Sequence, residues 1–136
     1  MLDFIKDSSH NVTSSSSWGN YKNSDTYKVY RGSLYRYSNS TWTVADTTNG
    51  SDVTKDTSIL LTTGATERNS SKNIYDVAGN CWEWTTEAYV NNFRVIRGGV
   101  YYLINGSDNP ASYRYKYYPP DITYGGSFRP LLYVAL

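Results

Sequence analysis

The side chains that most often carry out chemistry in proteins are scarce in this sequence. Cys81 is its single cysteine and His10 its single histidine. One cysteine can form neither an internal disulfide nor a cysteine-based metal cluster. One histidine argues against histidine-rich zinc sites and histidine-based catalytic triads. His10 also lies in a serine-rich N-terminal stretch, which we expect to be disordered.

The carboxylates of the C-terminal half do not form a recognisable catalytic pair. No two of them have a spacing that marks a general acid and a general base. These residues are Asp76, Glu83, Glu87, Asp108 and Asp121. The sequence also contains no phosphate-binding glycine loop, no zinc-ligand spacing and no nucleophile elbow. We therefore predict no catalytic residues and no metal ligands, and we expect the chain not to be an enzyme.

The residue composition of one segment favours binding of a ligand rather than catalysis. Between Gly99 and Gly126 the sequence is rich in Tyr, Asn, Ser and Asp. Such a mixture is typical of binding loops, where rigid aromatic rings supply contact area and small polar residues supply hydrogen bonds. The alternative is ordinary loop composition, because Asn, Ser, Asp and Gly are common in turns. The predicted ligand-binding residues are Tyr101, Tyr102, Asn105, Ser107, Asp108, Asn109, Lys116, Tyr117, Tyr118, Asp121, Thr123 and Tyr124.

Charge and length restrict the partners and the organisation. The 136 residues carry a formal net charge of +1, which disfavours a nucleic-acid partner bound through a basic face. No apolar run is long enough to cross a bilayer, so we expect no membrane insertion. Residues 1–5 are too short and too acidic for a signal peptide. We expect a flexible lead-in or linker over residues 1–17 and a single domain over 18–136.

The N-terminal half is expected to contain short strands and one helix. Tyr27–Arg31 and Leu34–Tyr37 are rich in β-formers and separated by Gly-Ser, which predicts a hairpin. Thr41–Val44 predicts a third strand. Asp52–Thr63 is the best helix candidate, with Asp52 as its N-cap and Gly64 as its C-cap.

The C-terminal half is expected to form strands. Phe93–Arg97 is a predicted strand ended by two glycines. Ala111–Tyr118 alternates, with Tyr113, Tyr115 and Tyr117 on one face of a strand. Ser127–Leu136 is a predicted final strand, in which Pro130 indicates an edge position or a bulge.

Three motifs in this half resemble those of one family. Residues 73–85 read NIYDVAGNCWEWT, which resembles the N-x-x-D-x-x-G-N-x-W-E-W segment of the formylglycine-generating, sulfatase-modifying family. RVIRGG at 94–99 resembles its R-V-x-R-G-G strand, and GSFR at 126–129 its closing G-F-R with one insertion. The resemblance implies an α+β, C-type-lectin-like fold, irregular, with short strands, few helices and long loops.

The resemblance also implies which residues form the scaffold. Trp82 and Trp84 bury large areas, while Glu83 between them points the opposite way in a strand. Arginines of the motifs would hold loops through several hydrogen bonds. The implied scaffold residues are Gly79, Asn80, Trp82, Glu83, Trp84, Arg97, Gly98, Gly99, Arg114, Phe128 and Arg129. Oxygen ligands near Asn80 and Glu83 suit calcium, but we assign no cofactor and no metal.

The sequence departs from the family at its copper site. The oxygenase members bind copper through two cysteines in a C-Y-R-Y-R-C-like strand. Ser112 and Tyr117 stand at these two positions here. Thiolates select monovalent copper and hydroxyls do not replace them, so we do not expect this chemistry. Cys81 lies elsewhere, inside the tryptophan motif, and is expected to act as a buried apolar residue.

The tyrosine-rich segments further resemble the variable proteins of diversity-generating retroelements. Those proteins have the same lectin-like fold, and adenine-directed mutagenesis of codons such as AAC diversifies surface positions near their C-terminus. We therefore expect a non-catalytic display domain that binds a protein or glycan on a cell surface, carried by a phage virion or a bacterial surface. Two alternatives stay open: a family enzyme with an altered, copper-independent activity, and a structural protein of a phage tail or cell surface that self-associates.

Overall fold

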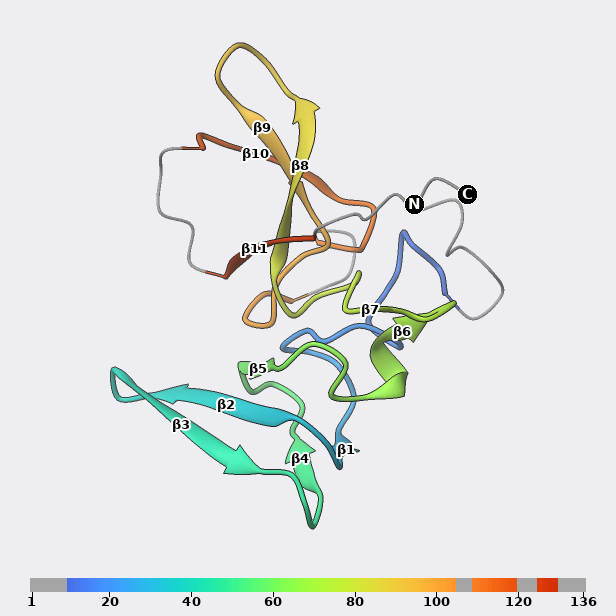
Figure 1. Ribbon diagram of the computed structural model, residues 1–136, viewed down its shortest axis with the longest axis vertical. Coiled ribbons are helices and arrows are strands. Elements are labelled where there is room, and N and C mark those ends of the chain that lie inside the picture. The colour runs from blue at the N-terminus through green and yellow to red at the C-terminus, as the bar shows by residue number, and fades with distance from the viewer. Residues whose placement is uncertain (1–9, 105–108, 120–124, 130–136) are drawn as a thin grey trace, which may run out of the picture.

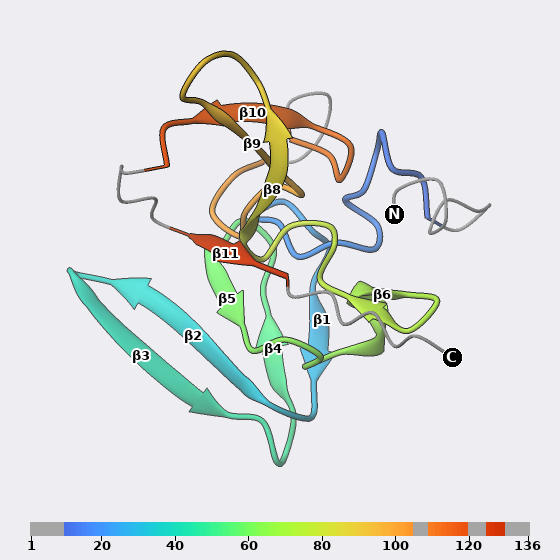
Figure 2. The same cartoon turned by 45° about the horizontal axis from the view of Figure 1, so that its top comes forward.

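The fold is built from short strands. The computed structural model describes residues 10–104, 109–119 and 125–129, which contain no α-helix and one 3-10 turn, η1 (Glu67–Asn69). The strands form several small sheets joined by long loops (Figures 1 and 2). The expected irregular, strand-rich architecture is thus observed, whereas the helical part of the α+β expectation is not. None of the described residues forms a helix long and apolar enough to span a membrane.

The largest sheet occupies one end of the molecule. Its strand order is β10-β9-β8-β11, with β8 (Trp82–Ala88), β9 (Arg94–Arg97) and β10 (Arg114–Tyr117) antiparallel. Strand β11 (Gly126–Phe128) runs parallel to β8. Figures 1 and 2 show the β8–β9 hairpin projecting away from the rest of the chain. The strands predicted around 93–97 and 111–118 are confirmed, while the prediction beyond Arg129 lies outside the described residues.

The other end of the molecule is formed by two further sheets. Strands β2 (Ser33–Ser38) and β3 (Thr41–Asp46) form a hairpin, and β5 (Ile59–Leu61) pairs with the opposite edge of β2. Strand β1 (Tyr27–Val29) pairs with β4 (Ser51–Val53).

The hairpin predicted around Gly32-Ser33 is therefore wrong, because β1 and β2 pair with different strands. The actual turn is Asn39-Ser40. Both of its residues have positive φ, 49° and 61°. Such a two-residue turn matches the twist of a hairpin, and Asn tolerates this backbone region.

The helix predicted over 52–63 is also wrong. The segment forms β4 and β5, separated by a turn in which Asp56 has φ of 62°. Ile59 and Leu61 are buried while Leu60 is half-buried, a strand period of two. The Thr, Val and Ile residues fit a pleated strand better than a helix. Gly64 is not a helix cap but a turn residue whose N–H donates to Asp76 Oδ2 at 3.1 Å.

A third, very small hairpin lies between the two ends. It consists of β6 (Ser70–Ser71) and β7 (Ile74–Tyr75), joined by Lys72 and Asn73 with positive φ values of 50° and 64°. The polar loop predicted around Thr66–Lys72 thus contains η1 and β6.

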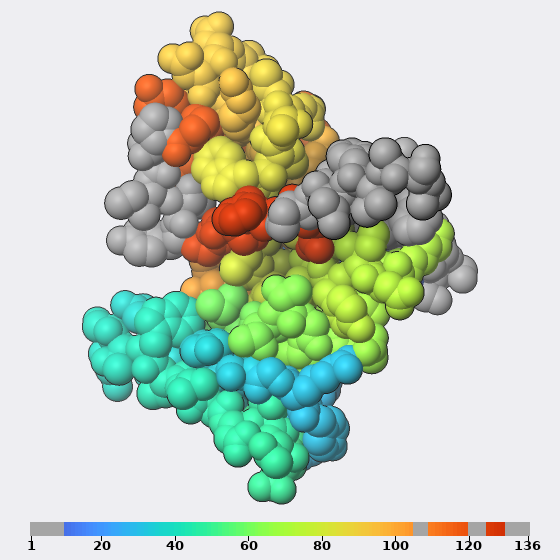
Figure 3. Space-filling model, in the orientation of Figure 1, coloured from blue at the N-terminus to red at the C-terminus, as the bar shows by residue number. Residues whose placement is uncertain are grey.

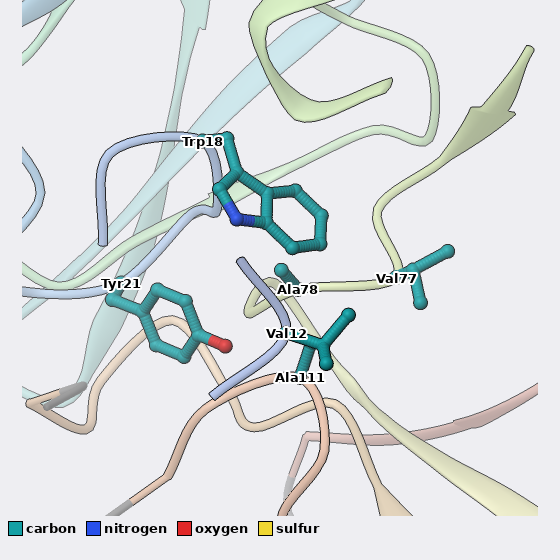
Figure 4. Packing of buried hydrophobic residues seen from close by; sticks show 6 residues of the cluster. All are labelled: Val12, Trp18, Tyr21, Val77, Ala78 and Ala111. Atoms are coloured by element: carbon teal, nitrogen blue, oxygen red, sulfur yellow. The ribbon is translucent and has the colours of Figure 1, made fainter. Parts of the chain in front are cut away.

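The first core cluster joins the N-terminal segment to the rest of the domain (Figure 4). Its buried members are Val12, Trp18, Tyr21, Val77, Ala78 and Ala111. The Val12 carbonyl accepts a hydrogen bond from the backbone N–H of Ser112 at 2.9 Å. Ser15 Oγ accepts one from Ala111 N–H at 3.0 Å. Residues from Val12 onward are therefore packed and bonded, while residues 1–9 of the expected lead-in lie outside the described part, so its extent stays a prediction.

Two further clusters serve the two ends. One lies among β1 to β5 and consists of Val29, Leu34, Val53, Ile59, Leu61 and Ala65. The other consists of Trp82, Ile96, Val100 and Tyr101, with the half-buried Trp84, Tyr113 and Tyr117 packed against it. The second of these lies directly under the site described below.

A buried polar junction connects the clusters. We call it the Asn80 junction: it comprises Asn20, Gly79 and Asn80 with their backbone partners. Asn80 Oδ1 accepts from Asn20 Nδ2 at 3.0 Å and from Leu61 N–H at 2.9 Å, and Asn80 Nδ2 donates to the Leu61 carbonyl at 2.9 Å. The backbone carbonyl of Asn80 also accepts a hydrogen bond from the Tyr101 N–H at 3.0 Å. The junction thus ties β5 to both the tryptophan motif and the 98–101 loop.

Candidate functional site: an aromatic groove

An aromatic groove lies on one face of the β8-β9-β10 sheet. It has a volume of about 370 Å³. Its lining residues are Trp82, Ile96, Tyr102, Leu103, Asn109, Tyr113, Tyr115 and Tyr117. We refer to this set as the aromatic groove.

Strand geometry places the rings of the groove together. Tyr115 lies opposite Ile96 in the β10–β9 pair, and Ile96 lies opposite Trp84 in the β9–β8 pair, so these three share a face. Because side chains alternate along a strand, Tyr113 and Tyr117 point to the face of Tyr115. Tyr113 and Tyr115 stack at a centroid distance of 6.3 Å and an angle of 17°, and Tyr115 stacks on Trp82 at 6.4 Å.

The opposite face of the same sheet is polar and ion-paired. Arg97 donates to Glu87 Oε2 at 2.9 Å and to the Ser112 carbonyl at 3.1 Å, and Arg114 pairs with Glu87 Oε1. The hydrogen bonds from Arg97 and Arg114 hold the pKa of Glu87 below its usual value. Arg97 therefore bonds a carboxylate of β8 and a backbone carbonyl that precedes β10, on the face of the sheet opposite the groove.

The structure brings together only part of the predicted ligand-binding set. Tyr102, Asn109 and Tyr117 line the aromatic groove. Lys116 points the other way, with its ammonium 5.6 Å from the Tyr89 ring centroid. Tyr118 packs against Phe93 on that side, at 5.8 Å between centroids.

The remaining predicted residues do not extend the groove in the described part of the chain. Tyr101 is only 9% exposed and belongs to the core beneath it. Asn105, Ser107, Asp108, Asp121, Thr123 and Tyr124 lie outside the described residues.

Five groove residues were absent from the predicted ligand-binding set: Trp82, Ile96, Leu103, Tyr113 and Tyr115. The sequence contained the signal for the two tyrosines, because its alternation puts Tyr113 and Tyr115 on the face of Tyr117. Trp82, expected as a scaffold residue, is buried in the core and also lines the groove. Tyr115 is 46% exposed, so its ring presents a large area to a ligand.

The C-terminal scaffold residues mostly hold loops. Arg129 donates to the Tyr75 carbonyl at 2.8 Å and pairs with Glu83, which lies on the face of β8 away from the groove. Gly98 accepts hydrogen bonds from Gly79 N–H and from the Tyr21 hydroxyl through its carbonyl. Phe128, expected as a scaffold residue, has 78% of its area exposed.

Phe128 and Glu83 belong to a second pocket, of about 490 Å³, which we call the Cys81 pocket. Its lining residues are Tyr35, Leu60, Leu61, Thr62, Thr63, Asp76, Asn80, Cys81, Glu83, Ser127, Phe128 and Arg129. Burial raises the pKa of the Cys81 thiol to about 11 and also raises the pKa of Asp76. A thiol with such a pKa is almost entirely protonated near neutral pH and is a poor nucleophile. Cys81 is half-buried rather than enclosed, so it lines the pocket as well as packing.

Neither copper nor calcium fits the residues at the positions considered for them. Tyr117 at one copper position is part of the groove, and Ser112 at the other presents a hydroxyl, so neither offers a thiolate. For calcium, Asn80 Oδ1 already accepts two hydrogen bonds, and Glu83 is paired with Arg129. No group of three or more His, Cys, Asp or Glu side chains suited to a metal occurs among the described residues.

Comparison with known proteins agrees with the motifs. A family model, the sulfatase-modifying factor enzyme 1-like domain, matches residues 14–123. No curated protein and no solved structure gave a significant match. The match spans most of the chain, including the tryptophan motif and the groove strands. The chain belongs to the family of sulfatase-modifying factor enzyme 1-like domains.

Proposed function

We propose that this chain is a non-catalytic binding domain that presents the aromatic groove to a protein or glycan ligand on a cell surface. The observation that carries the proposal is the composition of the groove. Its rim is made of tyrosines, with Asn109 beside them and Trp82 as its floor. Tyrosine and tryptophan supply large contact area at low cost in side-chain entropy, and they dominate recognition surfaces.

The two faces of the sheet differ in a way that supports this proposal, because one is held by ion pairs and the other presents aromatic rings. On the polar face, the Glu87 carboxylate pairs with both Arg97 and Arg114. The groove face has stacked rings with phenol groups at its rim. A solvent-exposed aromatic surface of this kind marks a site of interaction.

The test is a capture experiment with a matched control. The immobilised domain is screened against arrays of glycans and of extracellular proteins, together with Tyr115→Ser and Tyr30→Ser variants. Tyr30 is an exposed tyrosine outside the groove. We expect Tyr115→Ser to weaken capture at least about tenfold, because one buried aromatic contact contributes about 1.4 kcal/mol or more. Equal capture by wild type and Tyr115→Ser would remove the groove from the binding site.

Diversification by a retroelement is part of this proposal. Tyr102, Asn109 and Tyr117 line the groove and are residues that mutated AAC-like codons encode. The decisive observation is genomic: a reverse transcriptase gene beside a near-identical template repeat that differs at adenines. A neighbourhood without such a repeat leaves a binding domain of fixed sequence.

The Cys81 pocket is the feature that favours the enzymatic alternative, since it gathers Asp76, Cys81 and Glu83 in a concavity. Its electrostatics count against nucleophilic catalysis, because the thiol is held protonated. Alkylation of Cys81 by iodoacetamide should therefore be slow at pH 7 and accelerate steeply towards pH 11. Fast alkylation at neutral pH would instead revive a catalytic thiol.

The structural alternative predicts self-association through the groove. Sedimentation of the domain at several concentrations tests it. We expect a monomer throughout, and a concentration-dependent dimer that Tyr115→Ser abolishes would favour assembly over ligand binding.

A further inference from the structure

A second aromatic pocket lies between the β2–β3 hairpin and the 101–102 loop. It has a volume of about 360 Å³. Its lining residues are Tyr37, Trp42, Ser58, Tyr101 and Tyr102. We call it the hairpin pocket. Figures 1 and 2 show the β2–β3 hairpin extending out from the body of the molecule, and Figure 3 shows its atoms forming the edge of the lower part.

The rings of the hairpin pocket face one another at steep angles. Tyr37 and Trp42 lie 5.1 Å apart at 48°, and Trp42 and Tyr101 lie 6.0 Å apart at 57°. Tyr101 and Tyr102 are nearly perpendicular, at 5.1 Å and 89°. Rings at these angles form several walls of a small enclosure, in contrast to the stacked tyrosines of the groove.

The walls are held by two independent parts of the fold. Tyr37 and Trp42 are direct partners across the β2–β3 pair, next to its tight turn. Tyr101 is 9% exposed, and its backbone N–H donates to the Asn80 carbonyl. The pocket is therefore formed before a ligand arrives, although Tyr37 and Trp42 leave 53% and 46% of their area exposed.

The chemistry of the walls selects the class of ligand. The pocket is lined by four rings and one serine hydroxyl, with no charged side chain among its described lining residues. The faces of aromatic rings carry partial negative charge and attract cations. Burial raises the pKa values of Tyr101 and Tyr102, which keeps both phenols neutral, so the attraction comes from the ring faces.

A methylated ammonium fits such walls better than other cations or a sugar. A primary ammonium requires hydrogen-bond acceptors when it leaves water, and a sugar requires several polar side chains for its hydroxyls. The hairpin pocket supplies the Ser58 hydroxyl and phenol oxygens, whereas a trimethylammonium group needs no hydrogen bond at all.

We propose that the hairpin pocket binds a trimethylammonium group. This site lies beyond the proposed function: it shares Tyr102 with the aromatic groove, but Tyr37, Trp42 and Ser58 do not belong to that groove. Choline-type headgroups and trimethylated lysine side chains both carry the recognised group.

The primary test compares a cation with its neutral isostere. Calorimetric titrations use choline and 3,3-dimethylbutan-1-ol, which replaces the charged nitrogen by carbon at nearly the same size. We expect saturable choline binding in the millimolar range or tighter, preferred at least about fivefold over the alcohol, as a cation–π attraction of about 1 kcal/mol requires. Equal binding of the two compounds, or no saturable choline binding in that range, would overturn the proposal.

Variants locate the binding. Trp42→Leu removes the strongest cation-attracting ring and should abolish the preference for choline, while Tyr37→Phe keeps a ring face and should retain it. Tyr30→Leu, an exposed aromatic residue elsewhere, is the matched control. Denaturant unfolding checks each variant, and Tyr37→Leu replaces Trp42→Leu if the latter fails to fold. Unchanged choline binding in the folded Trp42→Leu or Tyr37→Leu variant contradicts the assignment.

Two further titrations separate the sources of the group. Phosphocholine represents a headgroup and Nε-trimethyllysine a modified side chain, with unmethylated lysine as its control. The tighter of the first two identifies the source, while lysine binding as tightly as trimethyllysine overturns recognition of methylated ammonium. An absence of choline binding would leave the groove proposal unaffected. That proposal is tested by ligand capture through the aromatic groove, which does not include Tyr37 or Trp42.

Discussion

The Asn80 junction and the aromatic groove lie close together in the fold and differ in almost every physical respect. The junction is buried, with each polar atom of the Asn80 amide bonded to a specific partner. The groove is lined by rings whose centroids lie 6.1 and 6.3 Å apart in neighbouring pairs, and some of these rings are partly exposed to solvent. A buried network tolerates little change, because an unpaired group costs about 1–3 kcal/mol. Exposed rings can be exchanged at small cost, which is what a recognition surface requires.

The largest difference is expected for Gly79→Ala. Gly79 has φ of 73°, and a Cβ there would collide with the Asn20 carbonyl oxygen. Gly64 has nearly the same φ, 76°, but its added Cβ would lie 3.9 Å from the nearest atom of Tyr75. Gly64→Ala should cost about 1–2 kcal/mol from backbone strain, and Gly79→Ala about 4 kcal/mol or more. Urea unfolding measures both, and similar costs would contradict the close packing assigned to the junction.

The Asn80→Ala substitution comes next. It leaves the Leu61 N–H and the Leu61 carbonyl without their present partner, and Asn20 Nδ2 keeps only its hydrogen bond to the Ile59 carbonyl. We expect a loss of about 3 kcal/mol or more in the free energy of unfolding. Asn49→Ala, at an exposed turn position, serves as the control and should change it by about 0.5 kcal/mol or less. A small effect at Asn80 would mean that water replaces its partners.

Removing single hydroxyl groups sharpens the comparison. The Tyr21 hydroxyl bonds Ser15 Oγ and donates to the Gly98 carbonyl, both at 2.9 Å in a buried site. Tyr21→Phe should cost about 1–3 kcal/mol. Tyr115→Phe in the groove should change stability by less than about 0.5 kcal/mol. Thermal unfolding of the two variants measures both losses. Equal losses of stability would contradict the difference assigned to the buried Tyr21 hydroxyl and the Tyr115 hydroxyl of the groove.

The smallest effect concerns the polar face behind the groove. Arg97 and Arg114 lower the pKa of Glu87 below its unfolded value of about 4.3. The stabilisation is thus present above that pH and is lost as the pH falls through the folded-state pKa. Glu87→Gln should be slightly less stable than wild type at pH 7 and equal to it in stronger acid. Unfolding midpoints measured against pH test this, and high salt should shrink the difference at pH 7.

The sequence predicted the C-terminal half far better than the N-terminal half. Strong motifs fixed the strand at 94–97, and alternation fixed the tyrosine face of β10. The N-terminal half lacked comparable signals. The run at 52–63 looked helical from its caps, but the positive φ of Asp56 and the pairing of its two ends with β1 and β2 decide its structure. Such long-range pairing cannot be deduced from a local pattern.

The sequence predicted the residue types of the candidate site correctly, but only some of the individual residues. Tyr102, Asn109 and Tyr117 were expected and line the groove, whereas Lys116 lies on the other face of the same strand. The alternation that marks Tyr113, Tyr115 and Tyr117 separates these two faces, and loop composition alone does not. The hairpin pocket could not be predicted, since Trp42 and Tyr101 meet only in the folded chain.

Tyr115 has the most exposed ring of the groove, and we expect it to serve binding while the rest of the domain stays stable without it. The most direct measurement is the free energy of unfolding of Tyr115→Ser together with its capture of the ligand selected by wild type. We predict a stability within about 1 kcal/mol of wild type and capture weakened at least about tenfold. A loss of several kcal/mol in stability with capture unchanged would show that the ring serves the fold, and would contradict its assignment to binding.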